Sequence, residues 1–271
     1  MLKQRIITAL LLLPIALGGF FLLEGLQFAL FIGAVITLGA WEWARLAGFD
    51  GQPQRCLFAA LAALLCAGLF LNPGLAWPLL GLAIAWWLVA TLLVLSYPRS
   101  SQLWAARPVR LLIGLLVLLP AWQGLVVLKQ MPQGNGLILA VMVLVWAADI
   151  GAYFAGRAFG KRKLAPQVSP GKSWEGVFGG MLLCLLLATA LGLYQHWPLG
   201  QLTGALLGTV VLVLISVVGD LNESMFKRQA GVKDSSNLLP GHGGILDRID
   251  SLTAAIPLFA VLLWLAGWGT R

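Results

Sequence analysis

Charged side chains are scarce in this sequence. Asp, Glu, Lys and Arg make up only 10% of its 271 residues, whereas 60% are hydrophobic. A water-soluble domain of this length has too little interior to hide so much apolar surface, which excludes an ordinary soluble protein. Most of the chain must therefore face lipid. Backbone groups in hydrocarbon have to be hydrogen-bonded inside the protein, so only helices or a closed barrel can cross it.

The short alternating segments that are typical of a membrane β-barrel are missing as well. The sequence has long continuous apolar runs instead, such as Leu111–Leu119 and Met181–Leu193. We therefore expect an all-α polytopic membrane protein. Because a span needs about 17–25 apolar residues, the sequence predicts about nine transmembrane helices, at residues 5–23, 26–45, 56–72, 76–96, 110–128, 135–156, 175–194, 201–223 and 251–269.

Cysteine is rare, and its positions argue against a zinc site. Cys56, Cys66 and Cys184 all lie inside apolar runs, and none belongs to a CxxC or Cys/His cluster. Buried small apolar side chains are the simplest interpretation.

The first 20 residues resemble a signal peptide, with two basic residues followed by an apolar stretch. A second apolar run follows almost at once, however, and no small-residue cleavage site stands out. We interpret this segment as a retained first span.

The basic residues indicate how the chain is oriented. With the N-terminus inside, sixteen Lys and Arg residues fall in inner segments, and only Lys129 and Arg271 fall outside. The positive-inside rule therefore predicts a cytoplasmic N-terminus and a C-terminus on the opposite side. In a membrane protein, this distribution explains the net charge of +8 without a nucleic-acid partner. The inner set is Lys3, Arg5, Arg45, Arg55, Arg99, Arg107, Arg110, Arg157, Lys161, Arg162, Lys163, Lys172, Lys227, Arg228, Lys233 and Arg248.

Acidic residues gather late in the chain, in the last inner segments and the helix ends that lead to them. We therefore divide the chain into an N-terminal transmembrane scaffold of about five spans, residues 1–134, and a C-terminal transmembrane catalytic region of about four spans, residues 135–271. The late acidic residues are Asp149, Glu175, Asp220, Glu223, Asp234, Asp247 and Asp250.

Asp149 lies inside an apolar helix, where an acid costs about 2.5–3.5 kcal/mol. Helical spacing places Tyr153 and either Gly156 or Arg157 on the same face. Asp149 is therefore a secondary candidate for the site, together with Tyr153 and Arg157. The alternative is a structural ion pair between Asp149 and an Arg or Lys of a neighbouring helix.

The segment from Ser169 to Gly176 reads SPGKSWEG. A P-loop would need glycine at position 166, which is Pro166, and a preceding strand in a soluble domain. The segment is better interpreted as a polar turn that leads Lys172 into the seventh span. Ser173 is placed to cap that helix, whose free N–H groups favour an anion. The alternative is a solvated helix start that binds no ligand.

The strongest signal is the segment from Gly219 to Asp250. Asp220, Ser224 and Lys227 follow at helical spacing on one stripe of a helix that leaves the membrane. Three glycines in Pro240–Gly244 permit a sharp turn with exposed N–H groups, which suits phosphate. Asp247 and Asp250 follow on one face, and Asp220 with Asp247 could share Mg²⁺. His242 could act as a general base or simply bond within the turn.

This segment resembles the signature of the CDP-diacylglycerol synthases, or phosphatidate cytidylyltransferases, of the bacterial type. The upstream Asp149 with AYFAGRAFGK, and SPGKSWEG, are also similar to that family. The matching signature elements are Ser224, Lys227-Arg228, Lys233-Asp234, His242-Gly243-Gly244, Asp247-Arg248 and Asp250.

The resemblance implies a reaction in which CTP and phosphatidate give CDP-diacylglycerol and pyrophosphate. It also implies dependence on Mg²⁺, a monovalent cation such as K⁺ beside it, and a homodimer in the bacterial cytoplasmic (inner) membrane with its site facing the cytoplasm. Asp220 and Asp247 would hold the metal, with Asp250 close behind and Lys227 beside them. The groups expected to contact substrate phosphate are Ser224, Arg228, Lys233, His242, Gly243, Gly244, Arg248, Lys172 and Ser173, with Asp234 as a secondary candidate.

Two other classes of function remain as alternatives. A CDP-alcohol phosphotransferase would carry its aspartates in an Asp-Gly frame that this chain lacks. A cation- or proton-coupled transporter could use Asp149 and Asp220 as a relay. Transporters usually show repeated halves, and we find no internal repeat.

Overall fold

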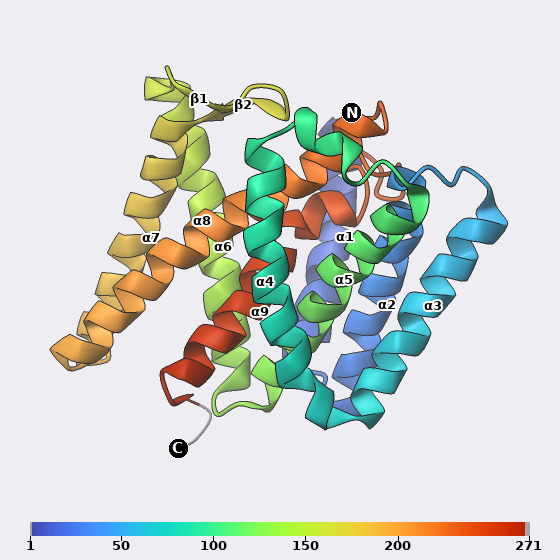
Figure 1. The fold of residues 1–271 in the computed structure, drawn as a ribbon. Coiled ribbons are helices and arrows are strands. Elements are labelled where there is room, and N and C mark those ends of the chain that lie inside the picture. The colour runs from blue at the N-terminus through green and yellow to red at the C-terminus, as the bar shows by residue number, and fades with distance from the viewer. Residues whose placement is uncertain (1, 269–271) are drawn as a thin grey trace.

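The fold is a bundle of membrane-length helices capped at one end by a small β-hairpin (Figure 1). The computed structural model describes residues 2–268, with the side chains of residue 8 and residues 10–268. Within this range the α-helices are α1 (Leu2–Phe21), α2 (Gly25–Leu46), α3 (Gln52–Leu71), α4 (Ala76–Leu95), α5 (Arg107–Gln130), α6 (Gly134–Phe159), α7 (Trp174–Tyr194), α8 (Leu199–Gln229) and α9 (Leu246–Leu265). The strands are β1 (Lys163–Ala165) and β2 (Ser169–Ser173), and two 3₁₀ turns are η1 (Pro73–Leu75) and η2 (Arg99–Gln102).

The prediction of an all-α polytopic membrane protein is confirmed. Eight helices, from α2 to α9, are long and apolar enough to cross a membrane. The expected first span coincides with α1, whose apolar part, Leu10–Phe21, is shorter than a full span. Large apolar side chains such as Leu64, Leu92 and Leu182 are more than half exposed on the outer surface, as expected where lipid is the solvent.

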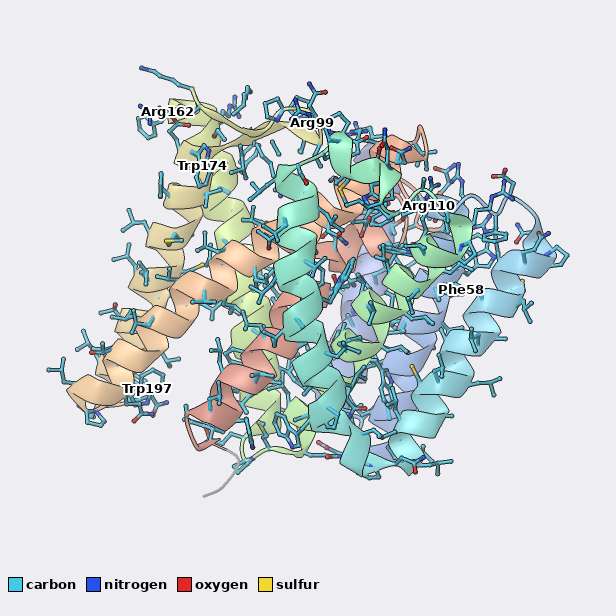
Figure 2. The ribbon with its side chains drawn as sticks, in the orientation of Figure 1. Phe58, Arg99, Arg110, Arg162, Trp174 and Trp197 are labelled. Atoms are coloured by element: carbon cyan, nitrogen blue, oxygen red, sulfur yellow. The ribbon has the colours of Figure 1, made fainter. Side chains whose placement is uncertain are left out.

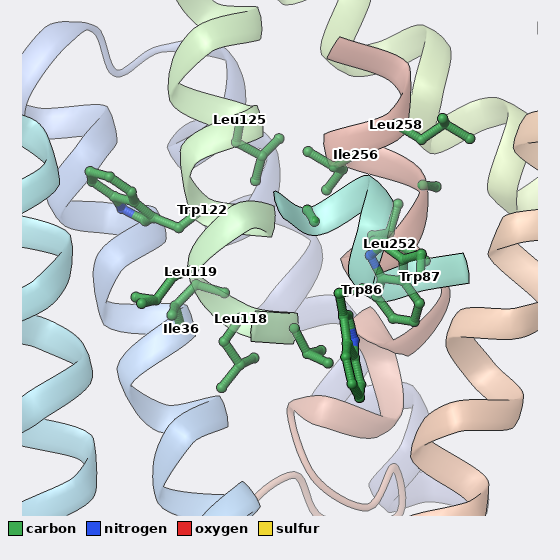
Figure 3. Packing of buried hydrophobic residues seen from close by; sticks show 14 of the residues in the cluster. Ile36, Trp86, Trp87, Leu118, Leu119, Trp122, Leu125, Leu252, Ile256 and Leu258 are labelled. Atoms are coloured by element: carbon green, nitrogen blue, oxygen red, sulfur yellow. The ribbon is translucent and has the colours of Figure 1, made fainter. Parts of the chain in front are cut away.

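Helix α5 forms the centre of the bundle. Within its most apolar stretch, 78% of the residues are buried, compared with 28–50% in the other spanning helices. Figure 3 shows Leu118, Trp122 and Leu125 of α5 facing α2, α4 and α9. The indole N–H of Trp122 donates to the Ala29 carbonyl of α2 at 3.0 Å. Helices from residues 1–134 and from residues 135–271 thus share one core, and the functional division at residue 134 stays a prediction.

Helices α6 and α7 approach each other unusually closely through glycines. A Cβ at Gly180 would overlap with the backbone of Ala148, and one at Gly151 would lie 2.8 Å from the Gly179 carbonyl oxygen. Small residues let membrane helices pack backbone to backbone, where dispersion and weak hydrogen bonds replace the hydrophobic drive. This contact fixes the hairpin β1–β2, which connects the two helices, above α8.

Two boundaries differ from the predicted ones by five residues or more. Helix α8 extends to Gln229 rather than residue 223, and α9 begins at Leu246 rather than residue 251. The segment after residue 223 contains Met, Lys, Arg and Gln, all good helix formers, so the helix continues after its apolar pattern ends. At about 1.5 Å per residue, the 31 residues of α8 span about 46 Å, longer than a bilayer core. The hairpin β1–β2, where a polar turn was expected, pairs Lys163 with Ser173 and Ala165 with Ser169.

Basic groups cluster at one end of the bundle. Figure 2 shows Arg99, Arg110 and Arg162 at the end that carries the hairpin, and Trp197 at the opposite end. The N-terminal start of α1 lies at the charged end in Figure 1. The arrangement agrees with the charge segregation in the sequence, while the side of the membrane that this end faces stays a prediction.

Candidate active site

Asp220 is held where the hairpin meets α8. The ammonium of Lys172, on β2, lies 2.6 Å from Asp220 Oδ2. The Ser224 hydroxyl donates to Asp220 Oδ1 at 3.2 Å, one helical turn further along α8. The Lys172 and Asp220 side chains are each about a quarter exposed (25% and 24%), so this pair is open to small charged molecules from outside the bundle.

Lys227 lies between two buried carboxylates. Its ammonium is 2.7 Å from Asp247 Oδ1 and 3.0 Å from Glu223 Oε1. The exposed fractions of the three side chains are 9%, 6% and 4% respectively. A buried charge is tolerated when it is paired and hydrogen-bonded. The predicted stripe of Asp220, Ser224 and Lys227 along α8 is therefore present, and it connects α8 to both β2 and α9.

The Asp247 carboxylate is surrounded by donors. Besides Lys227, its Oδ2 accepts hydrogen bonds from the Ser235 N–H at 2.9 Å, the Ser235 hydroxyl at 2.9 Å and the Gly244 N–H at 2.8 Å. The Gly244 N–H was expected to contact a substrate phosphate, and in the structure it donates to Asp247. Asp247 therefore fixes the loop between α8 and α9 against the end of α8.

The glycine-rich turn has the shape that its sequence predicts. Gly241 and Gly243 have φ values of +77° and +81°, in the left-handed region that glycine adopts without strain. The turn is closed by hydrogen bonds between Leu239 and Gly243 and from His242 N–H to the Leu239 carbonyl. Within residues 2–268, the buried Nδ1 of His242 has no hydrogen-bond partner. A chemical role for His242 stays a prediction.

The remaining predicted cations differ in what they contact. Lys233 and Arg248 are exposed, as is Asp234, and among the described residues no side-chain hydrogen bond or ion pair engages them. Arg228 has a structural contact, because its Nε donates to the Val168 carbonyl at 3.1 Å and holds the hairpin loop against α8. Lys233 and Arg248 are thus the cations with free ammonium or guanidinium groups beside the turn.

One residue of the predicted α6 face, Asp149, is linked to the same region. Asp149 interacts electrostatically with Lys172 and Asp220, and the Arg157 guanidinium donates to the Tyr153 hydroxyl at 3.2 Å. The interaction with Lys172 is compatible both with the catalytic interpretation and with a structural ion pair, so the role of Asp149 stays a prediction.

Ser173 caps α7 as predicted. Its hydroxyl accepts the Gly176 N–H at 3.2 Å. One free N–H of that helix is therefore already satisfied by the cap, and Ser173 itself is buried. Contact between Ser173 and a substrate phosphate stays a prediction.

The donor set around Asp220 fits a divalent cation. Acidic groups outnumber the cations in this region, since Asp220 interacts electrostatically with Asp149 and with Asp250, and Lys172 interacts with all three. Among the described residues, no three His, Cys, Asp or Glu side chains form a ready-made cage. Mg²⁺ does not need one, because it is typically held by one or two carboxylates, water and substrate phosphates. Asp247 fits less well, since four donors already occupy its oxygens.

The sequence interpretation missed Glu42 of α2. This carboxylate is completely buried and accepts hydrogen bonds from the Ser236 hydroxyl, the Ser235 hydroxyl and the N–H groups of Ile245 and Leu246. An acid inside an apolar span is costly, and the same reasoning that singled out Asp149 could have found Glu42. The buried Glu223 beside Lys227 was likewise not singled out.

Fold and site together define a polytopic helical membrane protein whose charged helix ends are suited to binding phosphates. The sequence profile of the cytidylyltransferase family matches residues 3–266. A protein of Pseudomonas aeruginosa named phosphatidate cytidylyltransferase is 69% identical, over 99% of both chains. Proteins of the same name from Haemophilus influenzae and Synechocystis sp. are 46% and 35% identical, over 96% of this chain and at least 97% of theirs. The chain belongs to the cytidylyltransferase family.

Proposed function

We infer that the chain is a membrane nucleotidyltransferase that transfers the cytidylyl group of CTP to phosphatidate, giving CDP-diacylglycerol and pyrophosphate. The family membership and the near full-length similarity to proteins named for this activity support it. The observation from the structure that carries it is the gathering of Asp220, Lys172 and Lys227 at the charged end of a lipid-facing bundle. A lipid substrate and a water-soluble nucleotide can meet only at such an end.

The reaction suits a site rich in charge and poor in bases. A phosphate oxygen of phosphatidate, already an anion at neutral pH, forms a bond to the α-phosphorus of CTP, and the bond from that phosphorus to the β-phosphate oxygen breaks. Pyrophosphate leaves with the electron pair, so no proton has to be removed from the nucleophile. Catalysis then depends on positioning and on neutralising the phosphates.

Each charged group has a distinct part in this proposal. Lys172, next to Asp220, and the exposed Lys233 and Arg248 would bind phosphate oxygens of CTP or phosphatidate. Lys227 holds Asp247 in place and contributes positive charge. When bound at Asp220, with Asp250 nearby, Mg²⁺ would neutralise charge on the CTP phosphates. Asp247 as its second ligand, and K⁺ beside it, remain expectations from the family resemblance.

We propose that the charged end of the bundle faces the cytoplasm of a bacterial inner membrane. The sixteen-to-two division of basic residues supports this orientation, and CTP would then reach the site directly. Phosphatidate would approach from the bilayer, with its acyl chains among the exposed apolar side chains of the helices. The proposed homodimer rests on the family resemblance alone, and chemical cross-linking in membranes tests it.

The test is turnover by the purified protein in detergent or proteoliposomes. Phosphatidate and labelled CTP are supplied with and without Mg²⁺, and the lipid fraction is analysed for labelled CDP-diacylglycerol and the water phase for pyrophosphate. We expect equal amounts of both, dependent on Mg²⁺. Release of CMP from CDP-diacylglycerol without CTP consumption would indicate a phosphotransferase instead. Ion flux across the proteoliposome membrane without CTP turnover would indicate a transporter.

A further inference from the structure

Glu42 is the one acid of α2 that lies deep in the protein, and the proposed chemistry does not use it. Its side chain has no exposed surface. Burying a carboxylate is expensive unless hydrogen bonds compensate for the lost water. Glu42 must therefore have partners of sufficient number and quality, and all of those found lie in the segment between Ser235 and Leu246.

The four partners divide evenly between the two carboxylate oxygens. Oε1 accepts from the Ser236 hydroxyl and from the Ile245 N–H at 2.9 Å. Oε2 accepts from the Ser235 hydroxyl at 3.1 Å and from the Leu246 N–H at 2.8 Å. The last two amides open α9, where N–H groups lack partners within the helix. Glu42 thus caps α9 from a helix some 200 residues earlier in the chain.

Ser235 connects Glu42 to the site. Its hydroxyl lies 3.1 Å from Glu42 Oε2 and 2.9 Å from Asp247 Oδ2, while its backbone N–H also donates to Asp247. A hydroxyl carries one proton and donates to one carboxylate at a time. The backbone N–H therefore keeps Asp247 bonded even when the hydroxyl proton points to Glu42.

Two further contacts restrain the same segment. Arg45, one turn after Glu42 on α2, donates to the Ser235 carbonyl at 3.3 Å. A Cβ at Gly244 would overlap with both Ser235 Oγ and Glu42 Oε1. The segment and the Glu42 carboxylate therefore fit together without spare room, which is what accurate placement of neighbouring groups requires.

We propose that Glu42 is a positioning residue for nucleotidyl transfer, which holds residues 235–246 so that Asp247 keeps its place beside Lys227 and the glycine-rich turn Pro240–Gly244 keeps its shape. We call the four hydrogen bonds between Glu42 and residues 235–246 the Glu42 clamp. Its expected effect on turnover rests on the proposed function, whereas the existence of the clamp does not. A carboxylate is required because each of its two oxygens faces a backbone N–H group, which can only donate. An amide at this position turns its own N–H groups towards one of these two donors.

The experiment compares Glu42→Gln with the wild type in two independent measurements. The first is hydrogen exchange of the backbone amides of Ile245 and Leu246, in the full-length protein in detergent. We expect exchange about tenfold faster or more in Glu42→Gln. The second is the steady-state turnover of CTP, for which we expect kcat/KM to fall at least tenfold while the unfolding temperature changes little. Unchanged exchange, or a kcat/KM within twofold of the wild type, would overturn the proposal.

The matched control is Glu24→Gln. Glu24 lies at the other end of α2, about 27 Å away by helical rise, and pairs with Lys129. It should leave both measurements unchanged. A loss as large as that of Glu42→Gln would show that any acid-to-amide change in α2 disturbs the enzyme, and would refute a specific role for Glu42.

A double variant separates positioning from general destabilisation. If Glu42 acts through Ser235, then Glu42→Gln with Ser235→Ala should lose no more kcat/KM than Ser235→Ala alone, which already removes the hydroxyl that Glu42 and Asp247 share. Losses that multiply would contradict that route. Should Glu42→Gln not fold, Ser236→Ala removes one of the four donors, and it should speed exchange at Ile245 by a few-fold; unchanged exchange would overturn the clamp. If the wild type makes no CDP-diacylglycerol, the proposed function fails, whereas the exchange measurement still decides whether the clamp exists.

Discussion

The Lys172 ammonium lies 2.6 Å from Asp220 Oδ2 and joins the hairpin β1–β2 to helix α8. Both side chains are about a quarter exposed, so solvent screens the pair and limits its value for stability to about 1 kcal/mol or less. The pair is therefore better explained by function than by folding.

Lys172→Met should lower turnover of CTP by about 10- to 100-fold, because a cation facing the developing phosphate charge is lost. The unfolding temperature should change little. Initial rates at saturating phosphatidate, together with thermal unfolding in detergent, check both expectations. Lys161→Met removes the same charge from an exposed position on the same face and should remain active. Equal losses in the two variants would indicate a general electrostatic effect rather than a role for Lys172.

Lys227→Met should lower both turnover and stability, and its cost in stability should be large, unlike that of Lys172→Met. The change leaves the buried Glu223 and Asp247 carboxylates without their shared cation, which typically costs about 3–5 kcal/mol. Chemical unfolding in mild detergent measures it. Adding Glu223→Gln and Asp247→Asn to Lys227→Met removes the unpaired charges and should recover part of the stability without recovering turnover. A single variant as stable as the wild type would contradict the buried triad.

Gly244→Ala tests the fit of the loop around Glu42 and Asp247. The added methyl group overlaps with Ser235 and Glu42, and overpacking of this kind costs about 1–3 kcal/mol. We expect lower thermal stability and weaker turnover. Gly136→Ala is the control, since a Cβ there meets no atom within 4 Å. The account of the loop fails if the two substitutions behave alike.

Accessibility of terminal tags tests the orientation. A tag at the N-terminus should react with impermeant reagents only after the inner membrane is opened, and a tag at the C-terminus should react from the periplasmic side of intact cells. The physical reason is the gathering of sixteen basic residues on one side. Finding both tags on the same side would require a different number of spans.

The helices could be predicted from the sequence because the bilayer requires them. Apolar length and charge segregation suffice to locate spans, and even the short third span corresponds to α3. The stripe of Asp220, Ser224 and Lys227 could be predicted because it depends only on helical spacing within α8. Residues related by local periodicity are accessible to this kind of reasoning.

The remaining parts of the site depend on contacts between distant segments. No local sequence pattern indicates that Glu42 contacts Ser236 and Leu246, or that Lys172 of the hairpin reaches Asp220 of α8. The pairing of β1 with β2 was missed because β1 has only three residues and β2 is rich in Pro, Gly and Ser, so neither strand has a clear alternating pattern. Asp247 was expected to bind metal. The loop before α9 donates three hydrogen bonds to its carboxylate, two from Ser235 and one from Gly244, and no local sequence pattern predicts them.

The most direct measurement of the central claim is the rate of CDP-diacylglycerol synthesis by Asp220→Asn over a range of Mg²⁺ concentrations, in protein shown to be folded by gel filtration and thermal unfolding. The account predicts a loss of at least about 100-fold that added Mg²⁺ does not restore, with Asp247→Asn also inactive but less stable, since it gives up the pair with Lys227. Asp50→Asn, at an exposed site, should behave as the wild type. Near-normal synthesis by both Asp220→Asn and Asp247→Asn would contradict the account.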